Sequence, residues 1–474
     1  MSEVPGRAGD APHRHAVVVG GGIAGLAAAH RLARAAPPGT AVTLLEGSPA
    51  LGGKLRTSEL AGLAVDEGAE ALLARVPEAL ALAREVGLGD DLVHPATTQA
   101  ALWTRGALRP IPAGTVMGVP GDLAALARSG VLSSAGLLRM TLDVALPRTP
   151  IGDDVAVGWY VAQRLGREVV DRLVDPLLGG VYAGRAAELS LAATVPALAA
   201  RARERRSLVA AARASRSTGT GPVFGAVRGG LGRLAAAVAD AAAAAGAQVR
   251  TGAMVRELAR SPDGWLLTVG PTRDEELVRA DVVVLALPAR PAARLLRDAV
   301  PAAARELDGI DYASMALVTL VLDAGSLPRL PGSGFLVPAV EGRLVKAATF
   351  LTRKWPWLAE RAPGLEVIRC SVGRHGDASD VQRDDDDLVA GCLADLSAAL
   401  GGGGRLVASR VTRWGGGLPQ YAVGHRARVE RIKAAVAAHP TLAVCGAAYD
   451  GIGVPACIRT AGCAVDRALA ALAG

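Results

Sequence analysis

The sequence is poor in lysine and in aromatic residues. Only four of its 52 basic residues are lysines, and phenylalanine, tryptophan and tyrosine make up 3% of the 474 positions. The formal net charge of +7 therefore depends on arginines, which are spread along the whole chain. Nucleic-acid-binding surfaces gather basic residues into patches and interleave them with aromatic ones. We therefore expect no nucleic-acid partner.

Cysteines are few, and long hydrophobic runs are missing. The five cysteines form no C-x-x-C pair, and none lies near a histidine at the spacing of zinc ligands, so we expect reduced thiols and no metal site. The sequence has no uninterrupted run of about 18 apolar residues, and its start lacks the apolar stretch of a secretion signal. These absences predict a cytoplasmic location.

The chain is long and apolar enough for more than one folded unit, with 51% hydrophobic and 20% charged residues. Residues 16–46 have the pattern of a strand, a glycine-rich turn, a helix and a second strand, which together make one βαβ unit. Helical periodicity dominates from about 110 to 218. Alternating apolar and polar residues at 311–325 and 335–372 predict an antiparallel sheet.

A glycine-rich turn joins the first strand to the first helix. Residues 20–25 (GGGIAG) fit the pattern G-x-G-x-x-G in the setting that a dinucleotide requires. Gly20 permits a tight turn, Gly22 lets the backbone approach a pyrophosphate, and Gly25 allows the helix to pack closely on the strand. Glu46 ends the second strand, where a carboxylate can accept the ribose hydroxyls. An acidic residue there favours FAD or NAD over NADP, and a glycine-rich turn without a ligand is the alternative.

The residues after Glu46 resemble the extended fingerprint of the FAD-dependent amine oxidase and protoporphyrinogen oxidase superfamily. In that fingerprint a Gly-Gly-basic turn follows the ribose carboxylate, as Gly52, Gly53 and Lys54 do here. Four further segments, in the family's order, resemble the bacterial porphyrinogen oxidases. They are residues 109–118 (RPIPAGTVMG), 175–184 (DPLLGGVYAG), 414–425 (WGGGLPQYAVGH) and 445–455 (CGAAYDGIGVP). The resemblance therefore spans nearly the whole chain.

This resemblance implies an α/β fold of three parts. A discontinuous Rossmann-like FAD-binding domain would comprise residues 1–75, 222–292 and 436–474. An α+β substrate domain would comprise residues 76–109 and 293–435. A helical insertion, residues 110–221, would cap the site.

The resemblance also implies FAD contacts in three separated stretches of the chain. Those of the first stretch, from the pyrophosphate to the flavin, are Gly20, Gly21, Gly22, Ile23, Ala24, Gly25, Glu46, Gly47, Gly53, Lys54, Gly68, Ala69, Glu70 and Ala71. Val255 would hold the adenine through its backbone. The isoalloxazine and ribitol would lie at the N-terminus of the last helix, near Ala447, Ile452, Gly453 and Val454, where the helix dipole favours a reduced, anionic flavin.

Substrate contacts are implied at three positions. Arg75 is the candidate for a propionate, and a surface arginine is its alternative. Gly180 and Ala183 match positions that line the cavity, where small residues would leave space for a flat ring, and helix packing is the alternative for both. The chain departs from its relatives at Gly68–Ala69, where many have Gly-Pro, and at Ala100, where animal and plant enzymes have an arginine near the substrate.

The reaction that the resemblance implies is the oxidation of a porphyrinogen to the aromatic porphyrin. Six electrons pass to flavin N5 as hydride over three turnovers, and molecular oxygen reoxidises the flavin to give three hydrogen peroxides. The flavin carries the chemistry, so we expect no catalytic side chain. Ala100 and the similarity to the Bacillus-like subgroup favour coproporphyrinogen III as the substrate, in haem biosynthesis. Protoporphyrinogen IX is the alternative.

Three more distant functions share this fold. An amine oxidase would frame the flavin with paired aromatic residues, of which only Tyr449 lies near the last glycine-rich turn. A carotenoid desaturase would need a long apolar tunnel, and a non-enzymatic escort-type protein would be expected to lose the FAD set. The resemblance leaves room for product hand-over to a ferrochelatase and for weak peripheral contact with the inner face of the membrane.

Overall fold

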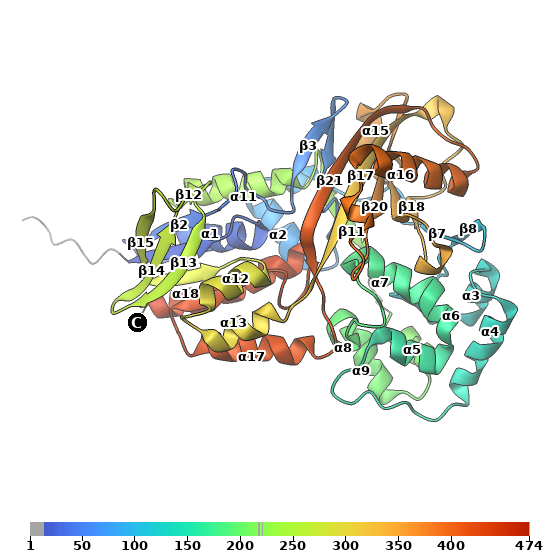
Figure 1. The fold of residues 1–474 in the computed structure, drawn as a ribbon, viewed down its shortest axis with the longest axis horizontal. Coiled ribbons are helices and arrows are strands. Elements are labelled where there is room, and N and C mark those ends of the chain that lie inside the picture. The colour runs from blue at the N-terminus through green and yellow to red at the C-terminus, as the bar shows by residue number, and fades with distance from the viewer. Residues whose placement is uncertain (1–13, 217–218, 220, 474) are drawn as a thin grey trace, which may run out of the picture.

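A parallel sheet lies at one end of the molecule, in a computed structural model that describes residues 14–216, 219 and 221–473 (Figure 1). Within these residues the sheet has five strands in the order β12–β2–β1–β16–β22. Their bounds are Gln248–Arg250 (β12), Ala41–Leu45 (β2), His15–Val19 (β1), Val282–Leu285 (β16) and Leu442–Val444 (β22). The strands come from distant parts of the chain. The predicted α/β class with a Rossmann-like parallel sheet is confirmed.

The side chains of β1 alternate between two apolar layers. Ala16 and Val18 pack with three helices on one face of the sheet, whereas Val17 and Val19 pack into a cluster on the other face. The three helices are Ile23–Ala35 (α1), Gly232–Ala244 (α11) and Val454–Ala473 (α18). This alternation is expected of a strand that is buried on both faces.

A small antiparallel sheet and three helices cover the other face of the parallel sheet. The sheet order is β13–β14–β15, with bounds Val255–Ser261, Gly264–Val269 and Glu276–Ala280. The helices are Ala289–Leu296 (α12), Pro301–Asp308 (α13) and His425–Ala437 (α17). Leu267, Leu296 and Ile432 from these elements are buried in the same cluster as Val17.

A second, larger sheet stands beside the first unit (Figure 1). Among the described residues it has seven strands in the order β21–β17–β20–β19–β18–β7–β8, and all neighbours are antiparallel except β18 and β7. The bounds are Leu406–Pro419 (β21), Tyr312–Asp323 (β17), Leu365–Val372 (β20), Val345–Phe350 (β19), Gly334–Leu336 (β18), Ala101–Thr104 (β7) and Ala107–Pro110 (β8). Ile368 and Cys370 of β20 pack with helix α16, Asp385–Leu400. The intervening Arg369 points to the opposite face, toward the parallel-sheet unit.

A helical unit lies below the larger sheet in Figure 1. Its helices are Leu123–Ser129 (α3), Ser134–Thr141 (α4), Val157–Leu165 (α5), Arg167–Val169 (α6), Asp175–Tyr182 (α7), Leu191–Thr194 (α8), Pro196–Glu204 (α9) and Leu208–Ala214 (α10). In its core the Arg164 guanidinium Nε lies 2.7 Å from Asp143 Oδ1, and both side chains are almost completely buried. Asp143 also accepts a hydrogen bond from the Ser207 hydroxyl at 2.6 Å. The buried pair is therefore well satisfied, as a buried charge requires.

The other strands and α-helices that the structure describes lie outside the groups given above. They are Thr57–Leu60 (β3), Leu63–Asp66 (β4), Leu72–Leu73 (β5), Pro77–Glu85 (α2), Leu92–Val93 (β6), Thr115–Val116 (β9), Val119–Pro120 (β10), Phe224–Val227 (β11), Leu351–Lys354 (α14) and Pro356–Arg361 (α15). None of the helices in the described ranges combines the length and the apolar character needed to cross a membrane.

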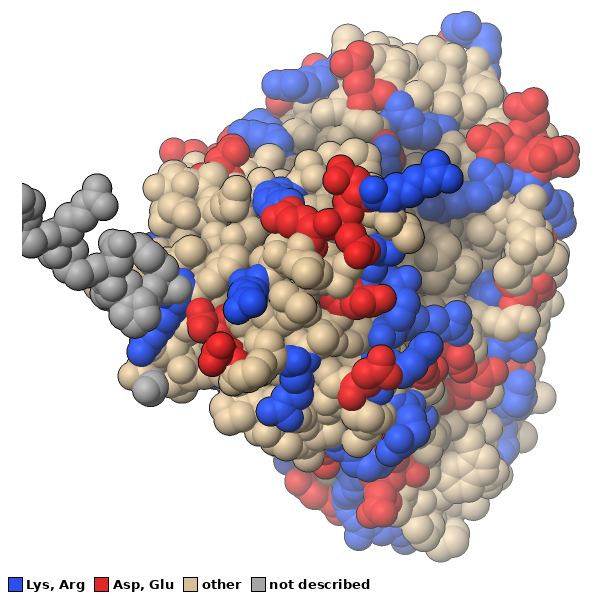
Figure 2. Space-filling model, turned by 60° about the vertical axis from the view of Figure 1, so that its left-hand side comes forward, with Lys and Arg blue, Asp and Glu red and all other residues tan. Residues whose placement is uncertain are grey.

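Basic and acidic side chains are interspersed over the face that Figure 2 shows. Arg431 pairs with Glu306 (Nε to Oε1, 2.7 Å), and Arg250 pairs with Glu276 (Nη1 to Oε1, 3.1 Å). Surface carboxylates of this kind offset part of the arginine excess locally.

Candidate active site

Most of the predicted cofactor residues meet at the carboxyl ends of the parallel strands. Gly20 follows β1, Glu46 follows β2, and Gly446 follows β22. The loop after β22 lies beside the start of α1 here, since a β-carbon added to Gly446 would lie 3.9 Å from the β-carbon of Ala24. In open α/β sheets this edge, with its converging helix N-termini, is where anionic ligands bind.

Three glycines of the first turn differ in what surrounds them. Gly20 has φ +108°, and a β-carbon there would lie 2.5 Å from the Ala286 carbonyl oxygen. A β-carbon on Gly25 would lie 1.8 Å from the Gly20 carbonyl oxygen, so α1 packs directly on the turn. A β-carbon on Gly22 would meet no atom within 4 Å. The space beside Gly22 is therefore open at the start of α1, as a bound phosphate requires.

Glu46 holds the glycine-rich turn in place. Its Oε2 accepts a hydrogen bond from the Gly21 amide at 2.6 Å, and its Oε1 accepts one from the Ser48 amide at 2.7 Å. Each carboxylate oxygen can accept a second hydrogen bond. The half-buried Glu46 can thus brace the turn and still accept ribose hydroxyls.

The stretch before Val255 lies beside Glu46 and Gly47. The Glu46 amide donates to the Arg250 carbonyl at 2.9 Å, and the Ala253 amide donates to the Glu46 carbonyl at 2.8 Å. A β-carbon on Gly47 would lie 2.5 Å from Cε of the half-exposed Met254. The structure therefore brings two predicted cofactor stretches together, although the Val255 side chain is itself buried.

Gly53 and Lys54 continue the rim of the turn. Gly53 has φ +56° and lies against Gly22. Lys54 is half-buried, and its Nζ has no hydrogen-bond or ion-pair partner among the residues that the structure describes. Burial lowers the pKa of Lys54, and the nearby Cys457 thiol in the first turn of α18 opposes this shift. A lysine without a counter-charge near the starts of α1 and α18 suits a phosphate group.

The turn that contains Gly68 and Ala69 is held by the seven-stranded sheet. A β-carbon on Gly68 would lie 2.1 Å from the Lys54 carbonyl oxygen, to which the Ala69 amide donates at 3.1 Å. Arg369 of β20 donates from Nη1 to the Gly68 carbonyl at 2.9 Å. Trp414 of β21 donates from its indole nitrogen to the Glu67 carbonyl, just before Gly68, at 2.7 Å. Two strands of the larger sheet thus fix this turn against the first unit.

The Glu70 carboxylate is engaged by protein side chains. Lys354 Nζ lies 2.7 Å from Oε1, the Trp355 indole nitrogen donates to Oε2 at 3.2 Å, and Arg369 Nη2 lies 3.6 Å from Oε1. Burial opposes ionisation, but the Lys354 and Arg369 charges outweigh it and lower the pKa of Glu70 to about 2. The carboxylate therefore ties the turn to the larger sheet. The neighbouring Ala71 is half-buried and packs on the cluster around Trp355.

The last predicted stretch forms the entry to α18. Ala447, Ile452 and Gly453 keep part of their surface accessible, whereas Val454 is buried against the helices of the first unit. Ile452 also packs against the core of the helical unit. No acidic residue lies in the first turn of α18. Its partial positive charge is therefore free to face a ligand.

The three predicted substrate residues lie in different settings. Arg75 is exposed and donates from Nε and Nη2 to the Gly221 carbonyl at 3.3 and 3.2 Å. Gly180 is exposed on α7, and a β-carbon there would lie 3.3 Å from Leu336 of the larger sheet. Ala183 is fully buried with φ +52°, and its carbonyl accepts a hydrogen bond from the His375 amide at 2.7 Å. The expectation that Ala183 lines the cavity is corrected, because protein atoms alone already cover its side chain.

Sequence reasoning missed the residues that hold the candidate site from a distance. Arg369 and Lys354 lie in no recognised motif, so their roles had no local signal. Trp414 and Tyr421 lie in a segment that carries the resemblance, but their pattern did not indicate a role. Tyr421 contacts the entry to α18 through its hydroxyl.

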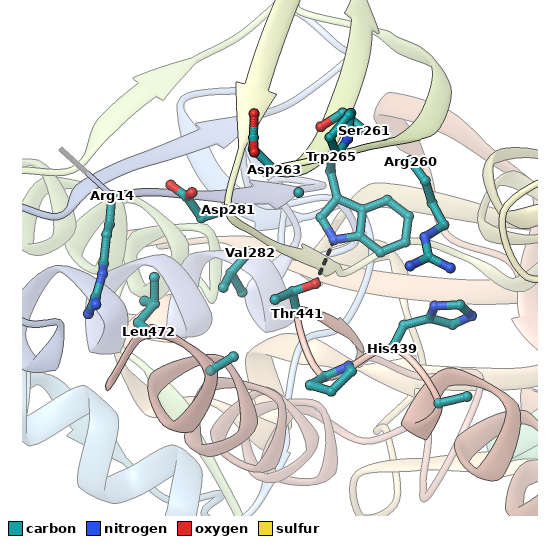
Figure 3. A pocket seen from close by; sticks show the side chains of 15 residues that line it. Arg14, Arg260, Ser261, Asp263, Trp265, Asp281, Val282, His439, Thr441 and Leu472 are labelled. Carbon is teal, nitrogen blue, oxygen red and sulfur yellow. Dashed lines mark hydrogen bonds between the residues drawn. The ribbon is translucent and has the colours of Figure 1, made fainter. Parts of the chain in front are cut away.

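A hollow of about 430 Å³ lies at the opposite edge of the parallel sheet (Figure 3). Arg14, Asp281 and Thr441, which precede β1, β16 and β22, line it together with Trp265 and His439. The Trp265 indole nitrogen donates to the Thr441 hydroxyl at 3.0 Å (Figure 3). Because the glycine-rich turns are at the other ends of these strands, this hollow is separate from the candidate cofactor site.

Comparison with known proteins gives the family. The sequence profile described as flavin containing amine oxidoreductase matches residues 23–469. A Mycobacterium tuberculosis protein named coproporphyrinogen III oxidase is 40% identical, with 96% of this chain and 97% of that protein covered. A Bacillus subtilis protein of the same name is 33% identical, with 96% and 98% covered.

A solved structure has the same fold over almost its whole length. The protein, from Exiguobacterium sp. 255-15, is described as a provisional protoporphyrinogen oxidase and is 32% identical with a TM-score of 0.84. The alignment covers 96% of this chain and 98% of that one. The open glycine-rich turn, Glu46 and the unpaired Lys54 fit a flavin cofactor that carries a phosphate group. The chain therefore belongs to the flavin-containing amine oxidoreductase family.

Proposed function

We propose that this chain is an FAD-dependent oxidase that converts coproporphyrinogen III to coproporphyrin III in haem biosynthesis. Molecular oxygen is the electron acceptor, and hydrogen peroxide is the second product. The observation that carries this proposal is the near full-length similarity to proteins named coproporphyrinogen III oxidase. The retained glycine-rich turn and the open space beside Gly22 support it.

The arrangement of the turn supports FAD as the flavin. A dinucleotide needs a place for its pyrophosphate, its ribose and its adenine. Gly22 and Lys54 offer the first, Glu46 offers the second, and the stretch that leads to Val255 lies beside Glu46 for the third. A mononucleotide would leave the last two unused.

Bound FAD would supply the redox chemistry by accepting two electrons with hydrogen at each turnover, so that loss of six hydrogens consumes three oxygen molecules and yields three of peroxide. The chain's own residues bind and orient. The amides at the start of α1 and the Lys54 ammonium offset the phosphate charges. Arg369 and Trp414 keep the Gly68 turn in one place, and α18 directs its positive end toward the site.

The sequence predicts residues 1–75, 222–292 and 436–474 for FAD, residues 76–109 and 293–435 for the substrate, and 110–221 as the cap, and we propose this division with three helices reassigned. The packing of these three helices supports their transfer to the FAD-binding unit. Helix α2 packs on the α1 side of the parallel sheet, and α13 and α17 pack on its other side. These three helices extend the FAD-binding unit.

The substrate would enter between the larger sheet and the helical unit. Gly180 is the supporting residue, because it is exposed and faces Leu336 across this junction without a side chain of its own. Arg75 remains our candidate for a propionate. Protoporphyrinogen IX is the second candidate substrate, favoured by the name of the Exiguobacterium protein.

The deciding experiment compares the two substrates. The purified, FAD-loaded protein is incubated in air with coproporphyrinogen III or protoporphyrinogen IX, while porphyrin fluorescence and hydrogen peroxide are followed. Controls without enzyme correct for autoxidation, and a Gly22→Val variant tests whether the bound flavin is required. We expect faster oxidation of coproporphyrinogen III with one peroxide for each two electrons. Preference for protoporphyrinogen IX would establish the second candidate, and no acceleration of either would refute both.

We propose peripheral membrane contact through the helical unit. Leu138, Leu142 and Val144 are 71%, 48% and 59% exposed. Arg139 follows Leu138 in the sequence, and the Arg206 guanidinium donates to the Val144 carbonyl. Apolar side chains next to arginines suit an anionic lipid surface. Sedimentation with anionic vesicles at low salt should pellet the protein, and serine at the three apolar positions should abolish pelleting. Recovery of the wild-type protein in the supernatant at low salt would refute the contact.

Product hand-over to a ferrochelatase is a further proposal, tested by co-sedimentation of the two purified enzymes.

A further inference from the structure

Tyr421 is connected to the entry of α18 through its hydroxyl group. The hydroxyl oxygen lies 2.8 Å from the Ala447 carbonyl oxygen, to which it donates, and 2.8 Å from the Gly451 amide nitrogen, from which it accepts. One side-chain atom therefore closes the loop between Ala447 and Gly451. The Tyr421 side chain is buried, so water does not compete for these two hydrogen bonds.

A second tyrosine, Tyr449, lies within this loop and makes no such link. The Tyr449 hydroxyl is buried and has no hydrogen-bond partner among the residues described. Its ring belongs to the apolar cluster on the far face of the parallel sheet. Tyr421, from outside the loop, therefore restrains the loop backbone through its hydroxyl, whereas Tyr449 is part of the loop and its hydroxyl makes no hydrogen bond to it.

Tyr421 is itself held firmly by its surroundings. Its ring stacks on His425 with centroids 3.9 Å apart and an interplanar angle of 14°, and it packs at a tilt on Tyr182 at 5.6 Å. Burial lowers the pKa of His425 to about 4, against the opposing effect of its contact with the Tyr449 carbonyl. His425 is therefore neutral near pH 7, and the stack carries no charge that would need a counter-ion.

The backbone around Tyr421 is tied to the helical unit. The Ser190 amide donates to the Tyr421 carbonyl at 2.7 Å, and Gln420 Nε2 donates to the Tyr182 carbonyl at 2.8 Å. The Gly424 amide donates to Asp154 Oδ2 at 2.8 Å. Residues 420–425 thus connect the helical unit to the loop that precedes α18.

We propose that Tyr421 is a positioning residue, whose hydroxyl fixes the Ala447–Gly451 loop and thereby sets the place of the flavin at the N-terminus of α18. This inference rests on the proposed function only in requiring that a flavin binds. Helix dipole effects fall off within the first turn. A small displacement of the loop therefore changes both the affinity for the flavin and its electronic environment.

The test compares Tyr421→Phe with Tyr449→Phe. Both changes remove one hydroxyl from a buried ring, but only the first removes hydrogen bonds to the loop. Flavin-free protein is titrated with FAD, and the visible spectrum and reduction potential of the loaded protein are measured. We expect Tyr421→Phe to weaken FAD binding about tenfold or more and to shift the spectrum and the potential. Tyr449→Phe should stay within about twofold of wild type in affinity and leave both signatures unchanged.

Equal behaviour of the two variants would overturn the proposal. So would a Tyr421→Phe protein that has a lower melting temperature but an unchanged flavin spectrum and potential, because that result would mean only a structural role. If Tyr421→Phe does not fold, 3,5-difluorotyrosine at position 421 weakens the hydroxyl as an acceptor and keeps its shape. An unchanged flavin spectrum in that protein would also count against the proposal.

These measurements need no porphyrinogen. If wild type binds FAD but oxidises neither porphyrinogen, the proposed substrate is wrong and the titration still tests Tyr421. If wild type is active, Tyr421→Phe at saturating FAD should lower kcat about tenfold with KM changed less than twofold. A change in KM alone would place Tyr421 at the substrate and contradict a positioning role toward the flavin.

Discussion

Gly25 lies so close to Gly20 that a β-carbon added to it would fall 1.8 Å from the Gly20 carbonyl oxygen. Neither group can move freely, because Gly20 follows a buried strand and Gly25 lies in the first turn of α1. We expect Gly25→Ala to destabilise the flavin-free protein by about 2–3 kcal/mol through overpacking. Thermal unfolding of the flavin-free protein measures this. An unchanged melting temperature would show that α1 can shift away from the turn.

Gly22→Val is the matched change in the same turn. The space beside Gly22 is empty of protein atoms, and its φ of −73° suits any residue. The flavin-free variant should therefore melt within about 1 kcal/mol of wild type, the usual range for a less favourable helix cap. Its affinity for FAD should fall about 100-fold, since the side chain occupies the phosphate position. Wild-type affinity would show that the phosphate lies elsewhere.

Lys54→Met tests the role of the unpaired lysine. The ammonium is half-buried without a counter-charge, so its removal should leave the stability of the flavin-free protein unchanged or slightly raised. FAD binding should weaken about tenfold, the effect of losing one charge-assisted contact. The salt dependence of FAD binding should also decrease. Fluorescence titration at two ionic strengths provides both values, and an unaltered salt dependence would contradict a phosphate contact.

Glu70→Gln should make the pH dependence of stability shallower. The pKa of Glu70 is depressed to about 2 from 4.5, so its ion pairs stabilise the fold above pH 4.5, and this contribution is lost as the pH falls toward 2. At pH 7 the variant should lose about 3 kcal/mol, the usual cost of breaking a buried pair. Denaturant unfolding between pH 3 and 7 should show that the difference in unfolding free energy between wild type and variant becomes smaller as the pH falls. A difference that is constant over this range would exclude the charge as its cause.

Asp66→Asn should change the pH dependence of stability in the opposite direction to Glu70→Gln. Burial raises the pKa of Asp66 to about 6, against its hydrogen bonds with Thr57 and the Leu231 amide. Between pH 4 and 6 the folded wild type holds this proton more tightly than the unfolded chain, so wild type loses stability as the pH rises. The variant lacks this loss and should be about 2 kcal/mol more stable relative to wild type at pH 7 than at pH 4. Denaturant unfolding over the same pH series measures this difference. If the stability of the variant relative to wild type fell as the pH rises, the raised pKa of Asp66 would be refuted.

Local spacing predicted the parts of the site that lie close together in sequence. The glycine-rich turn and Glu46 are within one βαβ unit, where periodicity and motif spacing are informative. The ties that hold the site together were invisible, because Arg369 and Gly68 are 301 positions apart and Lys354 and Glu70 are 284 apart. No periodic pattern connects such residues.

Ala183 shows a different reason for failure. A small residue in a family segment was interpreted as space for a ring, but protein atoms completely cover Ala183. Sequence indicates that a residue is small without indicating which neighbour makes it so. The exposed Gly180, three positions earlier, is consistent with the original interpretation.

The order of strands in the parallel sheet has a consequence for synthesis of the chain. β1 lies next to β16, and the His15 amide bonds to the carboxylate of Asp281, 266 residues later. At typical elongation rates the first strand waits roughly 13–50 seconds on the ribosome for this neighbour. β22, the last strand, follows later still. An apolar βαβ segment is thus exposed throughout that interval, and we expect production of this protein to depend on chaperones that bind nascent chains.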